Sequence, residues 1–239
     1  MVESDRLPRA FDGLRVTLLT DVHGAAFGED SQRLLSAVEK ALPDVIAISG
    51  DLVDRYSETD DLRPMLTGLT QIAPVYYVTG NHEWDRADTE QVLAIIEDCG
   101  VSVLRNGFVT VEQDGQTMVI AGAEDPNGYA DQMTPEELVA KIRQKIPGDP
   151  YVMMLYHRNN ALALWAGLDV DLVLSGHGHG GVIRIPGIGG LIGVDRTLLP
   201  KDCEGLYTHG RTTQAVSCGL AGVRLWNRPH IPTLVLECK

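Results

Sequence analysis

Five short polar segments, each directly after an apolar run rich in β-branched residues, limit the folds open to this chain. Such runs predict β-strands, and each strand should end where its polar segment begins. Because parallel strands place their carboxyl ends at one edge of a sheet, the polar residues should gather at that edge. In chain order the segments are Asp21-Val-His23, Gly50-Asp51-Leu-Val-Asp54, Gly80-Asn81-His82-Glu83, Tyr156-His157 and Gly176-His177-Gly178-His179.

The donor groups in these segments are carboxylates, imidazoles and one amide, with no thiolate. Hard and borderline donors of this kind suit divalent ions outside a cysteine cage, and Mn, Fe, Zn or Ni all fit. Seven donors exceed the roughly four to six ligands that one ion takes, so we expect two ions. The expected metal ligands are Asp21, His23, Asp51, Asn81, His157, His177 and His179.

Local spacing separates the roles of several of these residues. Asp21 and His23 lie two apart on an extended segment, so both side chains point the same way and can bind one ion. Asp51 is the expected bridge, because one carboxylate can serve two ions roughly 3.5 to 4 Å apart. Asn81 and His82 are adjacent, so their side chains point in different directions and should have different roles. Each motif alone has an ordinary explanation, such as a turn, an N-cap or a core histidine, and only their combination favours a metal site.

Composition sets the class of protein. A chain of 239 residues with 44% hydrophobic content can bury a full core, and we expect one domain over residues 1–239. The formal charge of −13 argues against nucleic-acid binding, which depends on Lys and Arg. Two bound metals would still attract a phosphate locally. The scattered cysteines show no Cys-x-x-Cys spacing and predict ordinary buried thiols in a reducing compartment.

The order of predicted elements indicates an α/β fold. Helices are expected near residues 34–42, 61–72 and 88–100, the last with an Asp88-x-x-Gln91 cap. Asp114-Gly115 predicts a hairpin, and Thr134-Pro-Glu-Glu137 opens a further helix. The glycine-rich C-terminal third should be mostly antiparallel sheet. We expect two facing sheets with helices outside, and at most a modest lid over residues 125–133.

The order of the five segments resembles the signature blocks of the calcineurin-like metallophosphoesterases. The resemblance runs from about Leu14 to the C-terminus, and later stretches look like a bacterial branch with YkuE-like and YaeI-like phosphodiesterases. That branch commonly carries Thr and Gln where this chain has Gly178 and Val182. Since neither position is a metal ligand, these departures concern substrate fit.

The resemblance implies a four-layer α/β/β/α sandwich and hydrolysis of a small-molecule phosphoester, by in-line attack of a hydroxide that bridges two metals. It places His179 at the first metal, and Asn81, His157 and His177 at the second. It makes His82 the proton donor to the leaving oxygen and Asp54 the residue that orients His82. A phosphodiesterase is preferred. The alternatives are a non-catalytic metal-bound scaffold and a phosphomonoesterase or protein phosphatase.

Several residues stay open at this point. Arg55 and Arg158 each follow a signature block and could hold phosphate oxygens or simply be solvated. Glu83 should support its loop, and His209 and His230 should be structural. No run approaches the roughly 20 apolar residues of a membrane span. A cytoplasmic enzyme is expected from the chain as given, with membrane association possible through a segment absent from it, because relatives in the branch often carry an anchor or export signal.

Overall fold

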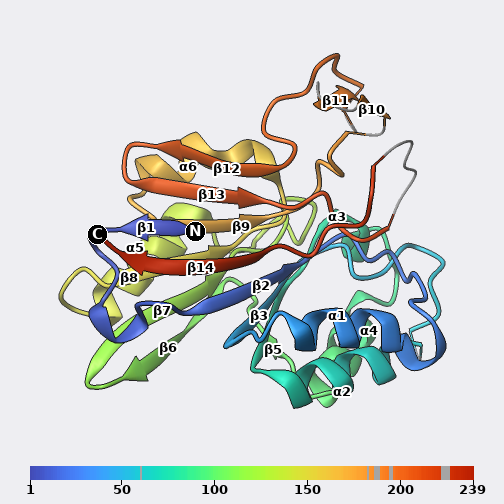
Figure 1. Cartoon of the computed structure of the whole chain (residues 1–239), viewed down its shortest axis with the longest axis horizontal. Coiled ribbons are helices and arrows are strands. Elements are labelled where there is room, and N and C mark those ends of the chain that lie inside the picture. Colours follow the sequence, from blue (N-terminus) through green and yellow to red (C-terminus); the bar gives the residue numbers. More distant parts are fainter. Residues whose placement is uncertain (60, 182, 186–188, 194–195, 222–226) are drawn as a thin grey trace.

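The computed structural model describes residues 1–59, 61–181, 183–185, 189–193, 196–221 and 227–239. Two six-stranded sheets form its centre. Figure 1 shows α1, α2 and α4 grouped on one side of the molecule and α6 on the other. Val182 lies outside the described residues, so the structure gives no account of the departure at that position.

The first sheet is mixed, with its parallel strands in the middle. Strands β2, β3, β4 and β5 are parallel, β14 is antiparallel to β2, and β1 is parallel to β14. The helices α1 (Gln32–Lys40), α2 (Leu62–Ile72) and α4 (Thr89–Asp98) connect these strands. The strand order is β1 (Val2–Ser4), β14 (Thr233–Cys238), β2 (Arg15–Leu19), β3 (Val45–Ser49), β4 (Val75–Val78) and β5 (Ser102–Val103).

The second sheet also has parallel strands in the middle, but each of its two edge strands is antiparallel to its neighbour. Strands β13, β9, β8 and β7 are parallel to one another. The helices α5 (Pro135–Lys145) and α6 (Leu162–Gly167) connect them. The strand order is β12 (Gly205–His209), β13 (Thr212–Val216), β9 (Leu172–Ser175), β8 (Tyr151–Leu155), β7 (Gln116–Gly122) and β6 (Gly107–Gln113).

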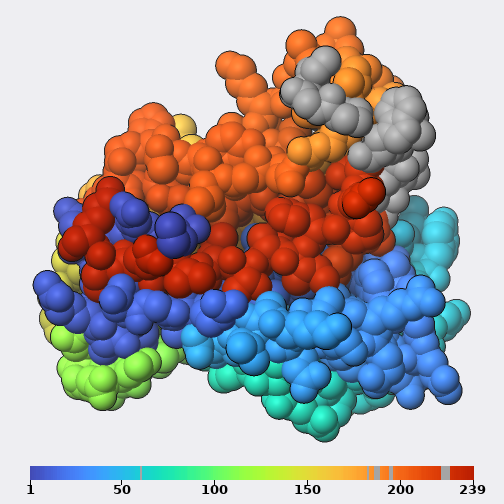
Figure 2. Space-filling model, viewed as in Figure 1, coloured from blue at the N-terminus to red at the C-terminus, as the bar shows by residue number. Residues whose placement is uncertain are grey.

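Smaller elements complete the description. A hairpin of β10 (Ile183–Ile185) and β11 (Gly189–Ile192) stands apart from both large sheets. It lies in the orange part of the chain that projects from the body in Figures 1 and 2. The short helix α3 (Asn81–Trp84) follows β4, and 3₁₀ turns span Arg9–Phe11, Glu29–Ser31 and Asn159–Ala161.

Strand alternation builds three apolar layers and so the four-layer sandwich. In β8, Met153 and Leu155 face the layer between the sheets, whereas Val152 and Met154 face the layer under α5 and α6. A third layer joins the first sheet to α1, α2 and α4 through residues such as Leu66. The α/β/β/α sandwich expected from the sequence is therefore confirmed.

Local predictions met different outcomes. The β6–β7 hairpin turns at Asp114-Gly115, both with positive φ, and Thr134 accepts a hydrogen bond from the Glu137 N–H as a capping box. Asp88 is the N-cap residue of α4 as predicted, but its side chain makes no cap hydrogen bond, because its carboxylate instead accepts two bonds from the Arg86 guanidinium. The C-terminal third is also less antiparallel than expected, since β13 pairs parallel to β9.

Candidate metal centre

The five polar segments meet where the carboxyl ends of two sheets face each other. Asp21, Asp51 and Asn81 follow β2, β3 and β4 of the first sheet. His157 and His177 follow β8 and β9 of the second. The sequence predicted the edge of one sheet, and the structure corrects this. Parallel strands supply every segment, but the facing arrangement of the sheets brings the two edges together.

Eight of the predicted site residues fall into overlapping clusters of ligand atoms. The donor atoms within each cluster lie within 4.8 Å of one another. Asp51 belongs to two of the clusters, as a bridging carboxylate would require. One cluster consists of Asp21, His23, Asp51 and His179, the second of Asp51, His157 and His177, and the third of His23, Asp54 and His82.

Asn81 supplies an independent test of fit for a metal. Its Oδ1 atom is buried and has no hydrogen-bond partner among the described residues. A buried amide oxygen without a partner costs roughly 1 to 3 kcal/mol, so such atoms usually have a ligand or water. An amide oxygen is also a suitable neutral donor for a divalent ion. The donor set and this atom together fit a metal centre.

Electrostatics in the second cluster keep Asp51 anionic. Its Oδ2 lies 3.1 Å from His157 Nε2. Burial raises the pKa of Asp51, but the charge and hydrogen bond of His157, together with the charge and backbone N–H of His82, outweigh burial and hold that pKa well below its usual range. Burial lowers the pKa of His157, and Asp51 more than reverses this, to about 10. Asp51 is thus poised to bind a cation.

The orientation of His157 also suits a ligand. Its Nδ1 lies 2.8 Å from the Ser49 carbonyl oxygen, which accepts the Nδ1–H and leaves Nε2 toward Asp51. Burial, followed by the charge of His157, lowers the pKa of His177 to about 4, which favours its neutral form. Neutral imidazole is the form that binds metals, so an ion in this cluster would displace the Nε2 proton that Asp51 stabilises on His157.

Glu83 fixes the loops that carry these residues. Its carboxylate is fully buried and accepts backbone N–H groups from both loops of the first sheet. The donors are Asp51 at 3.0 Å, Leu52 at 2.6 Å, Val53 at 3.2 Å and Gly80 at 2.7 Å. The sequence indicated a supporting role, but its four bonds depend on a contact between two loops that no local pattern reveals.

Backbone strain concentrates at the same place. Asp21, His23, Asp51, His177 and His179 all have φ between 48° and 62°. Non-glycine residues seldom adopt this left-handed region, and such strain clusters at functional sites. Glycine at position 50 allows the loop to pass close to its neighbour, since an added Cβ would lie 2.6 Å from the Gly80 Cα.

Asp54 touches two histidines rather than one. Its Oδ1 lies 3.0 Å from His82 Nδ1, as expected, and also 2.6 Å from His23 Nδ1. The side chains of His82 and Asp54 are 37% and 45% exposed, in contrast to 0% and 1% for Asp21 and Asp51. The buried carboxylates therefore form the floor of the centre, and His82 stands at its open side.

The candidate phosphate-binding arginines differ in their contacts. Arg158 donates two bonds to the buried Asp125 carboxylate, at 2.7 and 2.8 Å. The Arg55 guanidinium lies 5.9 Å from the centre of the Tyr56 ring. Arg158 is therefore already paired, which weakens its case as a phosphate clamp.

The remaining predictions concern peripheral residues. Within the expected lid, Tyr129 packs on Trp84 and donates its hydroxyl hydrogen bond to Glu90, so this segment is tied to the helices beside the centre. His209 ends the edge strand β12 and is exposed. Two cysteines are buried as predicted, Cys203 and Cys218, whereas Cys99 and Cys238 are half-buried.

His230 belongs to a further cluster with Glu204 and Cys218. The Arg184 guanidinium pairs with the Glu204 carboxylate and lies 3.4 Å from the Cys218 sulfur. A resident positive charge opposes a second one, so this cluster does not favour a metal ion.

Comparison with known proteins agrees with this geometry. Residues 14–181 match the calcineurin-like phosphoesterase family, and the chain belongs to that family of metal-dependent phosphoester hydrolases. It is similar to the uncharacterized metallophosphoesterase YkuE of Bacillus subtilis, with 27% identity over 94% of this chain and 78% of that protein. The resemblance seen in the sequence is confirmed.

A zebrafish relative has a different length. It is named a transmembrane protein with metallophosphoesterase domain and is 32% identical over 74% of this chain. The chain spans only 43% of that protein. Among the described residues, no helix has the length and apolar character needed to cross a bilayer.

Solved structures share the fold at low identity. A dimetal phosphatase from Danio rerio has a TM-score of 0.54 at 14% identity, over 95% of this chain and 93% of that one. The NAD nucleotidase of Haemophilus influenzae has a TM-score of 0.57 at 13% identity, over 86% and 50%. At such identities the likeness establishes the fold alone.

Proposed function

We propose that this chain is a dinuclear metal-dependent phosphodiesterase. The observation that carries the proposal is Asp51, whose carboxylate belongs to two adjoining ligand clusters. The partnerless, buried Oδ1 of Asn81 supports it independently. Asp21, His23, Asp51 and His179 would hold one ion, and Asp51, Asn81, His157 and His177 the other.

Two divalent ions at this place would polarise phosphoryl oxygens and activate a water as the nucleophile. Mn, Fe, Zn or Ni would all suit the donor set. The name of the zebrafish relative supports membrane association as a further part of the proposal, through a segment other than those described here.

The protein's own proton donor is His82. Its imidazole is 37% exposed at the open side of the centre, where a substrate can reach it. The Asp54 carboxylate, 3.0 Å from His82 Nδ1, would hold that nitrogen protonated and turn Nε2 toward the leaving oxygen. His82 would then release the alkoxide as an alcohol by donating its Nε2 proton.

The pairing of Arg158 favours a diester over a monoester. A monoester carries a second negative charge, which calls for an additional cation beside the metals. Arg158, the arginine after His157, already forms a two-bonded ion pair with Asp125. A singly charged diester needs less compensation, which agrees with the phosphodiesterases that the sequence resembles.

A hydrolysis panel on metal-reconstituted protein tests the proposal. We expect faster turnover of bis(p-nitrophenyl) phosphate than of p-nitrophenyl phosphate or a phosphoserine peptide, and loss of all turnover with a chelator. Preference for either monoester would replace the diesterase by a phosphatase. Full metal binding without hydrolysis of any compound would support the non-catalytic scaffold instead.

A further inference from the structure

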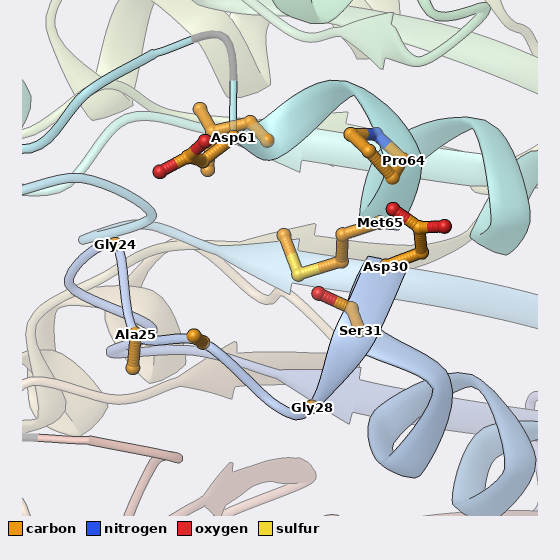
Figure 3. A pocket seen from close by; sticks show the side chains of 10 residues that line it. Gly24, Ala25, Gly28, Asp30, Ser31, Asp61, Pro64 and Met65 are labelled. Carbon is orange, nitrogen blue, oxygen red and sulfur yellow. The ribbon is translucent and has the colours of Figure 1, made fainter.

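Two pockets of the molecule differ in charge, and one of them adjoins the candidate metal centre. One begins at Gly24, directly after His23, and the carboxylates of Asp30 and Asp61 line it (Figure 3). The other adjoins His177 and has a volume of about 120 Å³. Its described lining is Asn159, Asn160, His177, Gly178, Gly193, Thr197, Pro200, Lys201 and Cys203.

The second pocket is continuous with the metal centre through two loops. Asn159 and Asn160 come shortly after His157, and Gly178 separates His177 from His179. A group bound in this pocket would therefore lie beside the second ligand cluster. Pockets for whole small-molecule ligands usually measure about 300 to 1,000 Å³, so this smaller pocket fits a substituent of a substrate.

The side chains that line this pocket favour an anionic ligand. Lys201 contributes an ammonium group and Asn160 an exposed amide, whereas no carboxylate lines the pocket among the residues that the structure describes. The first pocket has the reverse character, with Asp30 and Asp61 and no described Lys or Arg. In a chain with a formal charge of −13, a cationic pocket next to the catalytic centre is a local exception.

Gly178 keeps this pocket open. An added Cβ at this position would lie 2.7 Å from Asn159 Nδ2, which donates to the Asp202 carbonyl oxygen at 2.7 Å. A larger residue would have to displace Asn159, so glycine and Asn159 together define the space beside His177.

We infer that the pocket beside His177 is a substrate subsite for a second phosphate-like anionic group, carried on an ester arm of the scissile phosphodiester. Lys201 is its main charge partner and Asn160 a hydrogen-bond donor. This inference rests on the proposed phosphodiesterase function and narrows its substrates to diesters with a further anionic group.

A matched pair of substrates tests the subsite. p-Nitrophenyl propyl phosphate and p-nitrophenyl 3-phosphopropyl phosphate share the scissile bond and leaving group and differ only at the far end. We expect kcat/KM to be roughly tenfold higher for the phosphopropyl ester, the usual effect of one hydrogen bond to a charged group, and to arise mainly in KM. Raising the salt concentration should shrink this preference.

Three variants test whether Lys201 and Asn160 cause the preference for the phosphopropyl ester. Lys201→Ala should abolish the preference and Lys201→Glu should reverse it, with turnover of the propyl ester within about twofold of wild type. Asn160→Ala should reduce the preference by a smaller factor. The matched control is Lys145→Glu, which makes the same charge change at the exposed end of α5 and should leave the preference intact.

The outcomes separate the two proposals. Hydrolysis of both esters at equal kcat/KM, or a preference that survives Lys201→Glu, would overturn the subsite and leave the phosphodiesterase standing. Hydrolysis of neither ester by metal-loaded protein would overturn the phosphodiesterase, and the subsite with it. Metal content and melting temperature of each variant identify any general loss of structure.

Discussion

The two sheets hold their shares of the metal centre in different ways. Loops of the first sheet are joined directly, because Glu83 binds the N–H groups after β3 and β4, and His23 donates its N–H to the Asp51 carbonyl oxygen at 3.0 Å. Loops of the second sheet are instead held by hydrogen bonds to residues of the first sheet. The His177 N–H donates to the Asp21 carboxylate at 3.1 Å, and His157 bonds to Ser49.

The first sheet is therefore the template for the centre: its loops hold one another in place, and the loops of the second sheet are positioned by them. Damage to its loops should propagate to ligands of both ions. Damage to the second sheet's loops should remain closer to the altered residue.

The largest effect is expected from Asp51→Asn, which removes the charge shared by both clusters. Metal content should fall from two ions to one or none, and activity by more than about 10³-fold, because the metals contribute several kcal/mol to the barrier. Elemental analysis of protein purified without chelator measures the occupancy. Two ions retained in the variant, or one ion in fully active wild type, would contradict the shared-ligand assignment.

His82→Ala separates proton chemistry from metal binding within the first sheet's loops. Both metals should remain, while hydrolysis of alkyl esters falls by roughly 10² to 10⁴-fold, since a poor leaving group needs its proton. A p-nitrophenyl ester should lose less, because nitrophenolate departs without protonation. An equal loss for both esters at constant metal content would make His82 a stabiliser of phosphoryl oxygens instead.

Glu83→Ala tests the template itself. The substitution leaves four backbone N–H groups without their acceptor, and we expect a loss of about 3 kcal/mol or more in the free energy of unfolding. Affinity for both metals should fall by roughly 10 to 100-fold. Denaturant unfolding and metal titration measure these changes. Glu97→Ala, at an exposed position of α4, is the control and should change neither.

Gly176→Ala probes the second sheet's dependence on the first. The new Cβ would lie 2.0 Å from Thr20 Oγ1, so the loop must shift, at a cost of about 1 to 3 kcal/mol. Binding of the ion held by His157 and His177 should weaken more than binding of the ion held by Asp21 and His23. Gly167→Ala meets nothing within 4 Å and should be close to neutral. Equal weakening of both ions would show that the two sheets are equally templates.

The sequence predicted elements whose signals are local. Asp114-Gly115 permits the positive φ values of a tight hairpin, and Thr134 and Glu137 cap their own helix. Features that depend on distant partners were missed. The contact of Asp54 with His23 joins residues from different loops, and the four N–H groups that Glu83 accepts come from two loops.

The candidate site was predictable as a set of residues because each block lies at a strand end. Its three-dimensional assignment to two sheets was not, since sequence spacing carries no information on which strands pair. The metal ligands, the roles of His82 and Asp54 and the single domain over residues 1–239 stay predictions until tested.

The position of β14 has a consequence for the order of folding. This strand, formed by residues 233–238, lies between β1 and β2, so β2 has an open edge until residues 233–238 are available. The Ala221 N–H, also late in the chain, donates to the Asp21 carbonyl oxygen at 2.8 Å. During synthesis from the ribosome, the metal loops should therefore remain unfinished until residues 221–238 have emerged, which delays metal capture until long after Asp21 and Asp51 have been synthesised.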